Sequence, residues 1–293
     1  MKTTAAVVTY NRKELLLECL DALLKVRGQP AILVIDNAST DGTQKALQPY
    51  IDKGLIKYLN TGSNLGGAGG FCFAIREAMK DDPDFVWIMD DDTIVQPDTL
   101  MKLLEQAEQH PKGGYFSSKA LWTDGSENVM NAHVRAETDR GQKALLCPEA
   151  TFVSLLLPAA SILQMGLPIK EFFIWGDDIE YTRRIHAARP GYYVPDSVVV
   201  HKTASNVGSN IALDSMDRLE RYRYAYRNEV YTARREGVYR SARQLAKIMY
   251  HSVRVLLKSR EAKARKIRLI WSASFQGLSF HPRIEYIQKS RQH

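Results

Sequence analysis

Short apolar runs alternate with amphipathic segments through the first 120 residues of the chain. Each run is rich in Val and Ile and ends near a polar or glycine-containing loop, which is typical of a buried strand. The longer segments between the runs have the apolar period of a helix, and Ser39 and Asp41 place capping chemistry before the second of them. The expected strands are Ala5–Thr9, Ile32–Asp36, Ile56–Leu59 and Phe85–Met89, and the expected helices are Lys13–Val26, Thr43–Lys53 and Ala68–Lys80.

This alternation of strand and helix predicts an α/β fold with a mostly parallel central sheet and helices on both of its faces. In such a sheet the carboxyl ends of the parallel strands meet at one edge, and ligands bind there. We therefore expect the functional residues to follow the strands directly.

The alternation ends near residue 113, and from Asp217 to about residue 273 the pattern is helical, with breaks at Gly237 and Ser259. A change in composition near residues 205–217 is the one candidate boundary. We therefore divide the chain into residues 1–210, with two halves at 1–120 and 121–210, and a helical region at 211–293. The further expected elements are strands at Tyr115–Leu121, Val129–His133 and Thr151–Leu157, a helix at Asp177–Arg189, a strand pair within Tyr192–His201 around Pro195 and Asp196, and helices at Asp217–Glu236, Tyr239–Lys258 and Glu261–Ser274.

Charge is divided unequally between the two ends of the chain. Of 293 residues, 45% are hydrophobic and 25% are charged, which is typical of a soluble protein with a sizeable core and excludes extensive disorder. Residues 218–293 hold 19 Lys and Arg against 5 Asp and Glu, whereas residues 1–217 hold 21 against 28. Such a basic end indicates an anionic partner, either nucleic acid or the cytoplasmic face of a membrane, with a solvated helix surface as the alternative.

Cysteine content and hydropathy bear on the compartment. The three cysteines, Cys19, Cys72 and Cys147, are odd in number and widely spaced, so neither a disulfide framework nor a zinc site is expected. The first apolar run meets Asn11 and Arg12 too early for a signal peptide, and no run approaches the ~20 apolar residues of a spanning helix. We expect a cytoplasmic protein that lies on the surface of any membrane it meets.

Polar residues follow the first two expected strands. Thr9, Asn11 and Arg12 come after the first, and Asp36 and Asn37 open a polar loop after the second. A carboxylate at the tip of a parallel strand is well placed to accept hydrogen bonds from a ribose or a base edge. The alternative is structural, because a lone Asp in such a loop is more often a helix or turn cap.

A glycine-rich turn follows the third expected strand and leads into a helix. It begins at Asn64, and Gly66 and Gly67 are the first of its four glycines. Glycines allow a ligand to approach the backbone closely, and the N-terminus of a helix favours a diphosphate. The turn is neither a dinucleotide fingerprint nor a P-loop, and a tight connection without a ligand is the alternative.

Three consecutive carboxylates, Asp90, Asp91 and Asp92, follow the fourth expected strand. They would repel one another unless a cation or hydrogen-bond donors neutralised them. Alternate residues of an extended segment point the same way, so Asp90 and Asp92 are placed to hold one hard divalent ion while Asp91 faces another ligand. A solvated acidic loop is the structural alternative.

A second carboxylate cluster follows an aromatic segment that ends at Trp175. Asp177 and Asp178 begin the expected helix, and Glu180 follows Asp177 by three residues, so a capping box explains Asp177 without a function. For Asp178 a functional role is favoured. His201 closes a run of valines, and by itself such a histidine is more often structural than a metal ligand.

The ordered set of these motifs resembles family 2 inverting glycosyltransferases of GT-A fold, with a Rossmann-like sheet. The resemblance runs to about residue 205 and is most like bacterial galactofuranosyltransferases, with rhamnosyltransferases next. The segments that carry it are Val8–Arg12, Asp36–Gly42, Asn64–Gly67, Asp90–Asp92 and Trp175–Glu180. One departure is Gly176, which separates Trp175 from the Asp pair where the galactofuranosyltransferases place the tryptophan directly beside it.

The resemblance implies roles for the candidate residues. Residues 1–120 would bind the nucleotide-sugar, residues 121–210 would form the acceptor half of the catalytic domain, and Trp175 would be a platform for a sugar or the acceptor. Asp178 matches the general base, and His201 matches the histidine that completes the metal site of Asp90 and Asp92, for Mn²⁺ or Mg²⁺. The donor, a UDP-sugar, would meet Thr9, Asn11, Arg12, Asp36, Asn37, Asn64, Gly66, Gly67, Asp91, Trp175 and Asp177.

The reaction implied is a single displacement that inverts the anomeric carbon, with no protein nucleophile. UDP-galactofuranose is the favoured donor, and a dTDP-rhamnose or UDP-hexose transferase is the alternative in the same family. The acceptor would be a lipid-linked or polysaccharide glycan, met at the inner face of the cell membrane by basic C-terminal helices that also carry apolar residues. Alternatively, those helices would form the interface of a homo-oligomer. Nucleic acid is not expected, because it would leave both carboxylate clusters without a role, and a sugar nucleotidyltransferase would need a glycine-rich phosphate loop after the first strand.

Overall fold

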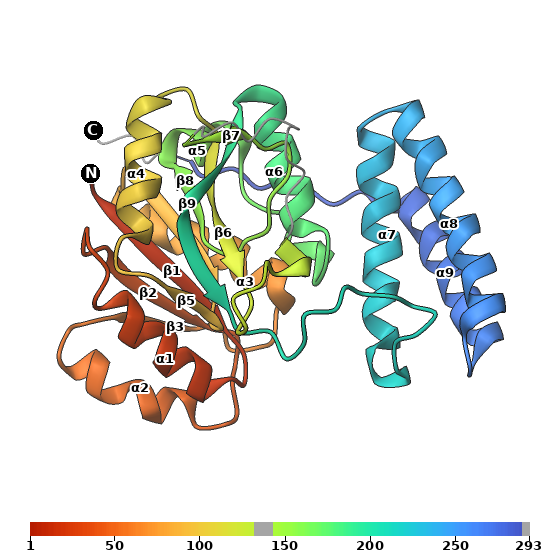
Figure 1. Ribbon diagram of the computed structural model, residues 1–293, viewed down its shortest axis with the longest axis horizontal. Helices are drawn as coiled ribbons and strands as arrows, with labels where there is room; N and C mark the ends of the chain where they lie inside the picture. The colour runs from red at the N-terminus through yellow and green to blue at the C-terminus, as the bar shows by residue number, and fades with distance from the viewer. Residues whose placement is uncertain (132–142, 289–293) are drawn as a thin grey trace.

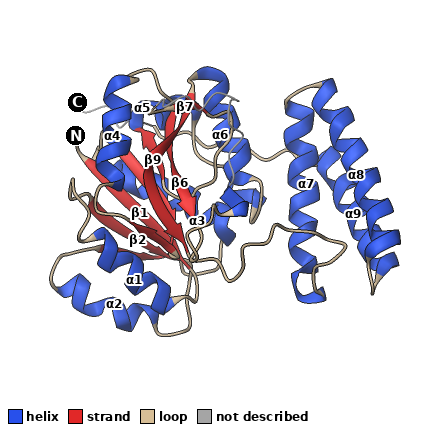
Figure 2. Cartoon of the chain, viewed as in Figure 1, coloured by secondary structure: helices blue, strands red, loops and turns tan. Residues whose placement is uncertain are grey.

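A computed structural model describes residues 1–131 and 143–288. Their strands form one mixed sheet in the order β3-β2-β1-β4-β8-β6-β9-β5, with β7 paired to β9, and helices on both sides (Figures 1 and 2). The first half is parallel, as predicted, and β8 joins it in the antiparallel direction. The strands are β1 Thr3–Thr9, β2 Ala31–Asp36, β3 Lys57–Asn60, β4 Phe85–Asp90, β5 Thr93–Val95, β6 Tyr115–Leu121, β7 Leu145–Leu146, β8 Leu155–Pro158 and β9 Gly191–His201.

Helices cover both faces of the sheet because successive residues of a buried strand point to opposite sides. In β1, Ala5 and Val7 contact one core and Ala6 and Val8 the other. The first core contains buried leucines of α1 Lys13–Leu23, α2 Thr43–Asp52 and α4 Thr99–Gln109. The second contains residues of α3 Gly66–Ala78, α5 Ala159–Met165 and α6 Asp177–Ala188.

Three further helices pack together beside the sheet (Figure 1). They are α7 Leu219–Arg235, α8 Val238–Lys258 and α9 Lys263–Ser279, close to the expected bounds. Gly277 allows α9 to approach α7, because a Cβ there would lie 2.6 Å from the carbonyl oxygen of Arg227. Their own core is made of Tyr222, Tyr226, Ile248, Val255, Ile270 and neighbouring residues. No helix within residues 1–131 and 143–288 is both long and apolar enough to span a bilayer.

The chain does not end at these helices. After α9 it returns to the body of the protein, where Glu285 forms ion pairs with Arg76 of α3 and, at 2.5 Å, with Lys170. The amide of Leu167 donates to the carbonyl oxygen of Glu285 at 2.8 Å. The last described residues therefore pack on the sheet-containing part of the molecule, which the helical pattern of this region did not predict.

The middle segment differs most from the expectation. The expected strand Val129–His133 is wrong over its described part, because Val129–Asn131 is a 3₁₀ turn; positions 132 and 133 lie outside the described residues. Side chains determine this turn, since Asn206 Oδ1 accepts from the Val129 amide at 2.7 Å and Asn128 Oδ1 from the Met130 amide at 3.0 Å.

Two other strands of the middle segment have different limits. The strand expected from Thr151 begins only at Leu155, because Ser154 takes a left-handed backbone conformation with φ of +57°. The strand pair expected around Pro195 is one strand, β9, whose register against β6 jumps from Val194 to Val198. Proline lacks the amide hydrogen that a regular ladder needs, so an irregularity accommodates it within one strand.

Candidate active site

The carboxyl ends of β1, β2 and β4 meet, as predicted. The sheet register pairs Thr9 of β1 with Asp36 of β2 and Val8 with Asp90 of β4. The loops that follow these strands therefore share one edge of the sheet, and hydrogen bonds join them. The backbone amide of Asn11 donates to Ser39 Oγ at 2.9 Å, and its Oδ1 accepts from the backbone amide of Thr40 at 2.7 Å and from the Thr40 hydroxyl at 3.4 Å.

Asp36 is fully buried at the tip of β2, and both its carboxylate oxygens have protein donors. Oδ1 accepts from the backbone amide of Ser39 at 2.8 Å. Oδ2 accepts from the Tyr58 hydroxyl at 2.7 Å and from the side-chain amide of Asn60 at 3.4 Å. Burial and the bond to Asp36 raise the pKa of Tyr58 to about 12. Asp36 therefore has the turn-capping role that was weighed as an alternative. Gly42 occupies the N-cap of α2, so neither Ser39 nor Asp41 is its cap, although Asp41 Oδ1 accepts from the backbone amide of Thr43 at 3.1 Å.

The glycine-rich turn is held by asparagines. Asn37 Nδ2 donates to Asn64 Oδ1 at 3.2 Å and to the Gly66 carbonyl at 3.0 Å, and Asn64 Oδ1 accepts from the Gly66 amide at 2.8 Å. Gly66 has a φ of +71°, and a Cβ there would lie 2.1 Å from the carbonyl oxygen of Phe173. Only glycine fits that position. A Cβ at Gly67 would meet nothing within 4 Å, so its side of the turn is open to a ligand.

The Asp triplet at the end of β4 is bound by two residues of the first loop. Thr9 Oγ1 donates to Asp91 Oδ2 at 2.7 Å. Arg12 Nη1 donates to Asp91 Oδ1 at 3.2 Å and to Asp92 Oδ2 at 2.7 Å. Asp91 and Asp92 are each 3% exposed, which excludes the solvated acidic loop as an explanation.

Asp90, Asp92 and His201 form a group that could hold a metal ion, with one ligand atom from each within 4.8 Å of the others. β5 pairs with β9 and brings His201 to the triplet through the register Thr93 with His201. His201 Nε2 lies 3.1 Å from Asp92 Oδ1. That oxygen is buried and has no hydrogen-bond partner among the described residues, as expected for an atom whose partner is a cation. Two carboxylates and an imidazole suit Mn²⁺ or Mg²⁺.

Asn131 orients the imidazole of His201. Its Oδ1 lies 2.7 Å from His201 Nδ1 and, as an acceptor, it requires the proton on Nδ1. In the neutral imidazole Nε2 then has no proton, and its lone pair is available to a metal ion; when Nε2 is also protonated, it faces Asp92 Oδ1 as a donor. A histidine that binds a metal commonly donates its other ring hydrogen in this way.

Burial and mutual repulsion set the charges of the cluster. Burial, reinforced by Asp92, raises the pKa of Asp90 to about 7, and burial raises that of Asp91 to about 6. Burial also opposes the ionisation of Asp92, but His201 and Arg12 outweigh it and lower its pKa. Burial favours the neutral form of His201, but Asp92 and Asp90 outweigh it and raise the pKa of the imidazole. Burial and mutual repulsion therefore oppose the ionisation of Asp90 and Asp91, which a bound cation would favour.

The second carboxylate cluster lies at the start of α6. Gly176, with a φ of +86°, occupies the N-cap, and Asp177 is the first residue of the helix without a capping hydrogen bond from its side chain. The capping-box alternative for Asp177 is therefore wrong. Glu180 instead pairs with Arg184, with Oε1 2.9 Å from Nε.

Asp177 and Asp178 differ in their surroundings. Burial and the neighbouring Asp178 raise the pKa of Asp177 well above its usual value, and Asp90 adds to this. Burial raises the pKa of Asp178 only to about 6, since the Ile179 amide donates to its Oδ1 at 2.8 Å. Burial therefore opposes ionisation more strongly at Asp177 than at Asp178.

Trp175 faces the helical region. Its ring lies edge-on to Tyr222 of α7, with 5.1 Å between centroids, and it packs against the core of α7–α9. It is half-buried, so part of its surface stays accessible. Packing explains Trp175 at least in part, and nothing in these contacts requires a platform for a ligand.

The structure thus brings Thr9, Arg12 and the Asp triplet together with His201, and places Asp177 within electrostatic reach of Asp90. Two contributors were missed by the sequence reasoning, Asn131 and Tyr58. The first lies in a segment expected to be a strand, and the second within a strand. Only the folded chain shows that they contact His201 and Asp36, because the partners are distant in sequence.

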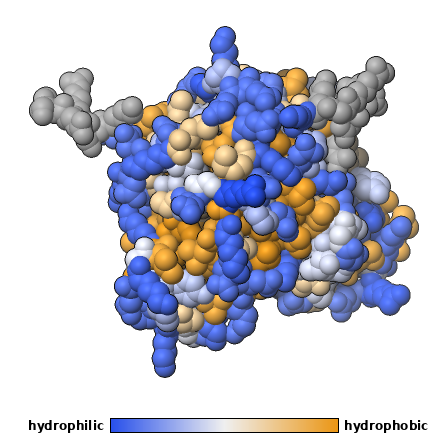
Figure 3. Space-filling model, turned by 60° about the vertical axis from the view of Figure 1, so that its left-hand side comes forward, coloured by the Kyte–Doolittle hydropathy of each residue, from blue (hydrophilic) through white to orange (hydrophobic). Residues whose placement is uncertain are grey.

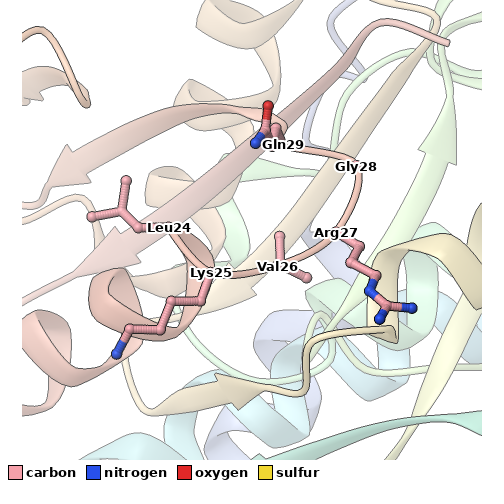
Figure 4. Close-up of a pocket in the computed structure, with 6 residues that line it drawn as sticks. All are labelled: Leu24, Lys25, Val26, Arg27, Gly28 and Gln29. Atoms are coloured by element: carbon pink, nitrogen blue, oxygen red, sulfur yellow. The ribbon is translucent and has the colours of Figure 1, made fainter.

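A separate hollow of about 440 Å³ lies at the opposite edge of the sheet, in the connection between α1 and β2 (Figure 4). In parallel units this connection lies at the amino ends of the strands, away from the site. The residues that line it are Leu24, Lys25, Val26, Arg27, Gly28 and Gln29, and none of them is a predicted site residue. The surface on that side of the molecule has apolar residues across its middle, bordered by hydrophilic ones (Figure 3).

Comparison with known proteins identifies the family. The sequence model described as "Glycosyl transferase family 2" matches residues 4–151, just over half of the chain. The chain belongs to this family. It is therefore a glycosyltransferase. The matched segment contains all the predicted site residues except Trp175, Asp177, Asp178 and His201.

Curated relatives agree with this family. Galactofuranosyltransferase GlfT1 of Mycobacterium tuberculosis is 27% identical over 256 residues, which cover 80% of this chain and 83% of that protein. The N-acetylglucosaminyl-diphospho-decaprenol L-rhamnosyltransferase of the same species is 25% identical over 240 residues, covering 70% and 77%. These are the two classes that the motifs resemble.

Solved structures agree in fold. GalNAc-T7 with UDP, GalNAc and Mn²⁺ superposes with a TM-score of 0.63 at 14% identity, over 80% of this chain and 48% of that one. The mannosyltransferase PcManGT from Pyrobaculum calidifontis, in complex with GDP-Man and Mn²⁺, has a TM-score of 0.56 at 16% identity, over 95% and 75%. The chain thus spans about half of the first structure and three quarters of the second. At these identities the likeness shows the fold alone, which is the GT-A fold predicted from the motifs.

Proposed function

We propose that this glycosyltransferase is an inverting, metal-dependent enzyme that moves galactofuranose from UDP-galactofuranose to a hydroxyl of a glycan acceptor. The observation that carries the metal dependence is the group of Asp90, Asp92 and His201, in which a buried oxygen of Asp92 faces Nε2 of His201 at 3.1 Å. The donor sugar rests on the similarity to GlfT1 and on the motifs.

The donor would lie along the carboxyl ends of β1, β2 and β4. Asp36, Asn37 and the loop from Thr9 to Arg12 would hold the uridine and ribose, with Asn11 fixing the loop. The turn at Asn64, Gly66 and Gly67 would approach the diphosphate at the N-terminus of α3. Before the donor binds, Arg12 would neutralise Asp91 and Asp92, to which it donates hydrogen bonds. When the donor is bound, Arg12 would turn to its phosphates, and Asp91 would accept a hydrogen bond from a hydroxyl of the donor.

Asp90, Asp92 and His201 would hold Mn²⁺ or Mg²⁺. When bound, the ion supplies the positive charge that stabilises the departing diphosphate. His201 offers Nε2 to it because Asn131 keeps the ring proton on Nδ1.

Asp178 would be the general base. It removes the proton of the acceptor hydroxyl as that oxygen attacks the anomeric carbon from the face opposite the diphosphate, which inverts the configuration. Burial and Asp178 oppose the ionisation of its neighbour Asp177, which in its protonated form would donate a hydrogen bond to the donor sugar. Two adjacent carboxyls with separated pKa values are a common basis for such divided roles.

A dTDP-rhamnose or UDP-hexose transferase is the second candidate, favoured by the rhamnosyltransferase relative. Purified enzyme incubated with Mn²⁺ and each nucleotide-sugar separates the two. UDP-galactofuranose should be hydrolysed slowly alone and transferred to a synthetic lipid-linked glycan, with the product detected by mass spectrometry. Transfer from dTDP-rhamnose instead would replace the proposed donor.

The chain would be arranged as a catalytic domain over residues 1–210, with a donor half at 1–120 and an acceptor half at 121–210, and a basic helical region from residue 211. That region would hold the enzyme on the inner, cytoplasmic face of the cell membrane, where a lipid-linked acceptor is found. Nucleic acid is not a proposed partner.

One face of α8 provides the surface for that contact. Ile248 and Val255 pack inward, whereas most apolar side chains of the helix are solvent-exposed. At 100° per residue they form one stripe along the helix, with the basic residues Arg243, Lys247 and Arg254 along its edge. An apolar stripe beside basic residues fits the interface of an anionic bilayer. The stripe consists of Val238, Tyr239, Leu245, Met249, Tyr250, Val253, Leu256 and Leu257.

The double substitution of Met249 and Val253 by glutamate should remove binding to vesicles of anionic phospholipid, because it places two negative charges in the stripe. Both side chains are more than half exposed, so the fold should be unaffected. Flotation with vesicles measures the bound fraction, and Met101→Glu on α4, also exposed, is the control that should still bind. Wild-type binding should fall as salt rises. If the stripe instead mediates a dimer, the wild-type protein will not bind vesicles. It will then dimerise in a concentration-dependent way without lipid, and the glutamate variant will not.

A further inference from the structure

The loop that leads into α6 has an unusual backbone conformation. Phe173, Trp175 and Gly176 have φ angles of +64°, +65° and +86°. Residues with a Cβ rarely adopt such angles, so surrounding contacts must hold this loop in place. Asp177 and Asp178 follow it directly, and its conformation therefore determines where their carboxyl groups lie.

A single side chain of α7 binds three carbonyl groups of this loop. Asn228 is fully buried, and its Nδ2 donates to the carbonyl oxygens of Phe172 at 3.0 Å, Trp175 at 2.9 Å and Ile174 at 3.3 Å. Asn228 belongs to the helical region, 50 residues beyond Asp178 in the sequence. It connects the two parts of the molecule at the point where the second carboxylate cluster begins.

The neighbouring Arg227 fixes which way the amide of Asn228 points. Its Nε and Nη2 lie 3.1 and 2.9 Å from Asn228 Oδ1, and a guanidinium only donates. The oxygen of the amide therefore faces Arg227, and the nitrogen faces the loop. Nη2 also donates to the carbonyl oxygen of Glu171 at 2.6 Å, just before the loop.

The opposite side of the loop contacts the donor half of the site. The Ala68 amide donates to the Phe173 carbonyl at 3.1 Å, and Gly66 lies against the same carbonyl. The loop is thus enclosed between the glycine-rich turn and α7. A change on the α7 side would shift the loop relative to the turn.

We propose that Asn228 is a positioning residue for the transfer reaction, which holds the loop over residues 172–176 so that the carboxyl groups at the start of α6 meet the acceptor and donor correctly. The inference rests on the proposed role of Asp178 as general base. It makes α7 part of the active-site framework in addition to any contact with a membrane.

Two substitutions at Asn228 test this role. Asn228→Asp keeps the shape and removes both N–H donors, and Asn228→Ala removes the side chain. A displacement of about 1 Å is enough to lower a rate by up to about 10²-fold, so kcat for transfer should fall by roughly 10- to 100-fold in both variants. The dissociation constant of UDP with Mn²⁺ should stay within about threefold of wild type, because the residues proposed for the nucleotide and the metal belong to other elements.

Thr232→Val is the matched control. Its hydroxyl donates to the Asn228 carbonyl at 3.0 Å one turn along α7, so the variant loses a buried hydrogen bond of the same helix but no bond to the loop. Its kcat should stay near wild type. If both Asn228 variants fail to fold, Gly176→Ala tests the same loop from its other end, because alanine is strained at a φ of +86° while the nearest atom, Asn228 Cβ, is 3.8 Å away.

The results separate failure of this inference from failure of the proposed function. If folded Asn228→Asp and Asn228→Ala transfer at the wild-type kcat while Asp178→Asn is impaired, Asn228 is not a positioning residue. Equal losses of kcat and UDP affinity would also overturn the role, since they indicate general damage. If Asp178→Asn itself turns over normally, the proposed base is wrong.

Discussion

Asp92→Asn should abolish metal-dependent transfer, with kcat reduced by at least about 10²-fold and no response to added Mn²⁺ or Mg²⁺. The amide keeps the size of the side chain but replaces an anionic ligand. Asp92 Oδ1 is the buried oxygen without a hydrogen-bond partner among the described residues, and it faces Nε2 of His201. Its loss removes a ligand from a group of three.

Metal binding without turnover provides the second measurement. Mn²⁺ should raise the melting temperature of the wild-type enzyme, and the shift should disappear in Asp92→Asn, because a ligand stabilises only the state that binds it. Glu77→Gln is a matched control. Glu77 is a buried carboxylate on α3 that pairs with Lys80 away from the site, so the variant should keep the Mn²⁺ response. Full activity of wild type after treatment with EDTA would rule out the metal dependence.

Asp178→Asn should lower transfer by about 10²–10⁴-fold, the usual loss when a general base is removed. UDP binding should be nearly unchanged, since the residues proposed for the nucleotide lie at the ends of β1, β2 and β4. Single-turnover measurement with bound donor isolates the step that the base assists. Asp177→Asn is informative beside it: a neutral amide resembles a protonated carboxyl, so it should retain much more activity than Asp178→Asn.

The same base predicts the acidic limb of the pH profile. Burial raises the pKa of Asp178 to about 6, so the carboxylate is available above that pH and is lost as the pH falls through it. The rate of wild-type transfer should therefore decline below about pH 6. A rate that is flat from pH 7 down to pH 4.5 would contradict Asp178 as the base.

Local pattern was enough to predict the parallel part of the sheet. The parallel strands from β1 to β4 are runs of buried residues that end at turns, and their pairing follows from the α/β alternation. It was therefore possible to predict that Thr9, Asp36 and Asp90 would share one edge. His201 was included only through the resemblance to a family, because a lone histidine at the end of a strand gives no sign of its partners.

Contacts between distant segments were beyond local pattern. Asn131 and Asn228 each interact with residues more than 50 positions away, and neither stands in a motif. The 3₁₀ turn at Val129–Asn131 depends on Asn206 in the same way. Left-handed angles at Phe173 and Trp175 are also unpredictable, since these residue types normally avoid them and only the surrounding contacts enforce them.

The return of the chain after α9 determines how the helical region is attached. Before α7, the segment that contains Asp214 is bound to α9, because the buried Lys266 of α9 donates to the Asp214 carbonyl at 3.1 Å. At its end, Glu285 binds Arg76 and Lys170 on the body. The segments before and after the three helices are thus both held by specific contacts. A C-terminal truncation that removes α8 and α9 would also remove the contacts of Glu285 with Arg76 and Lys170. Substitutions on α8 are therefore needed to test its apolar stripe without disturbing that attachment.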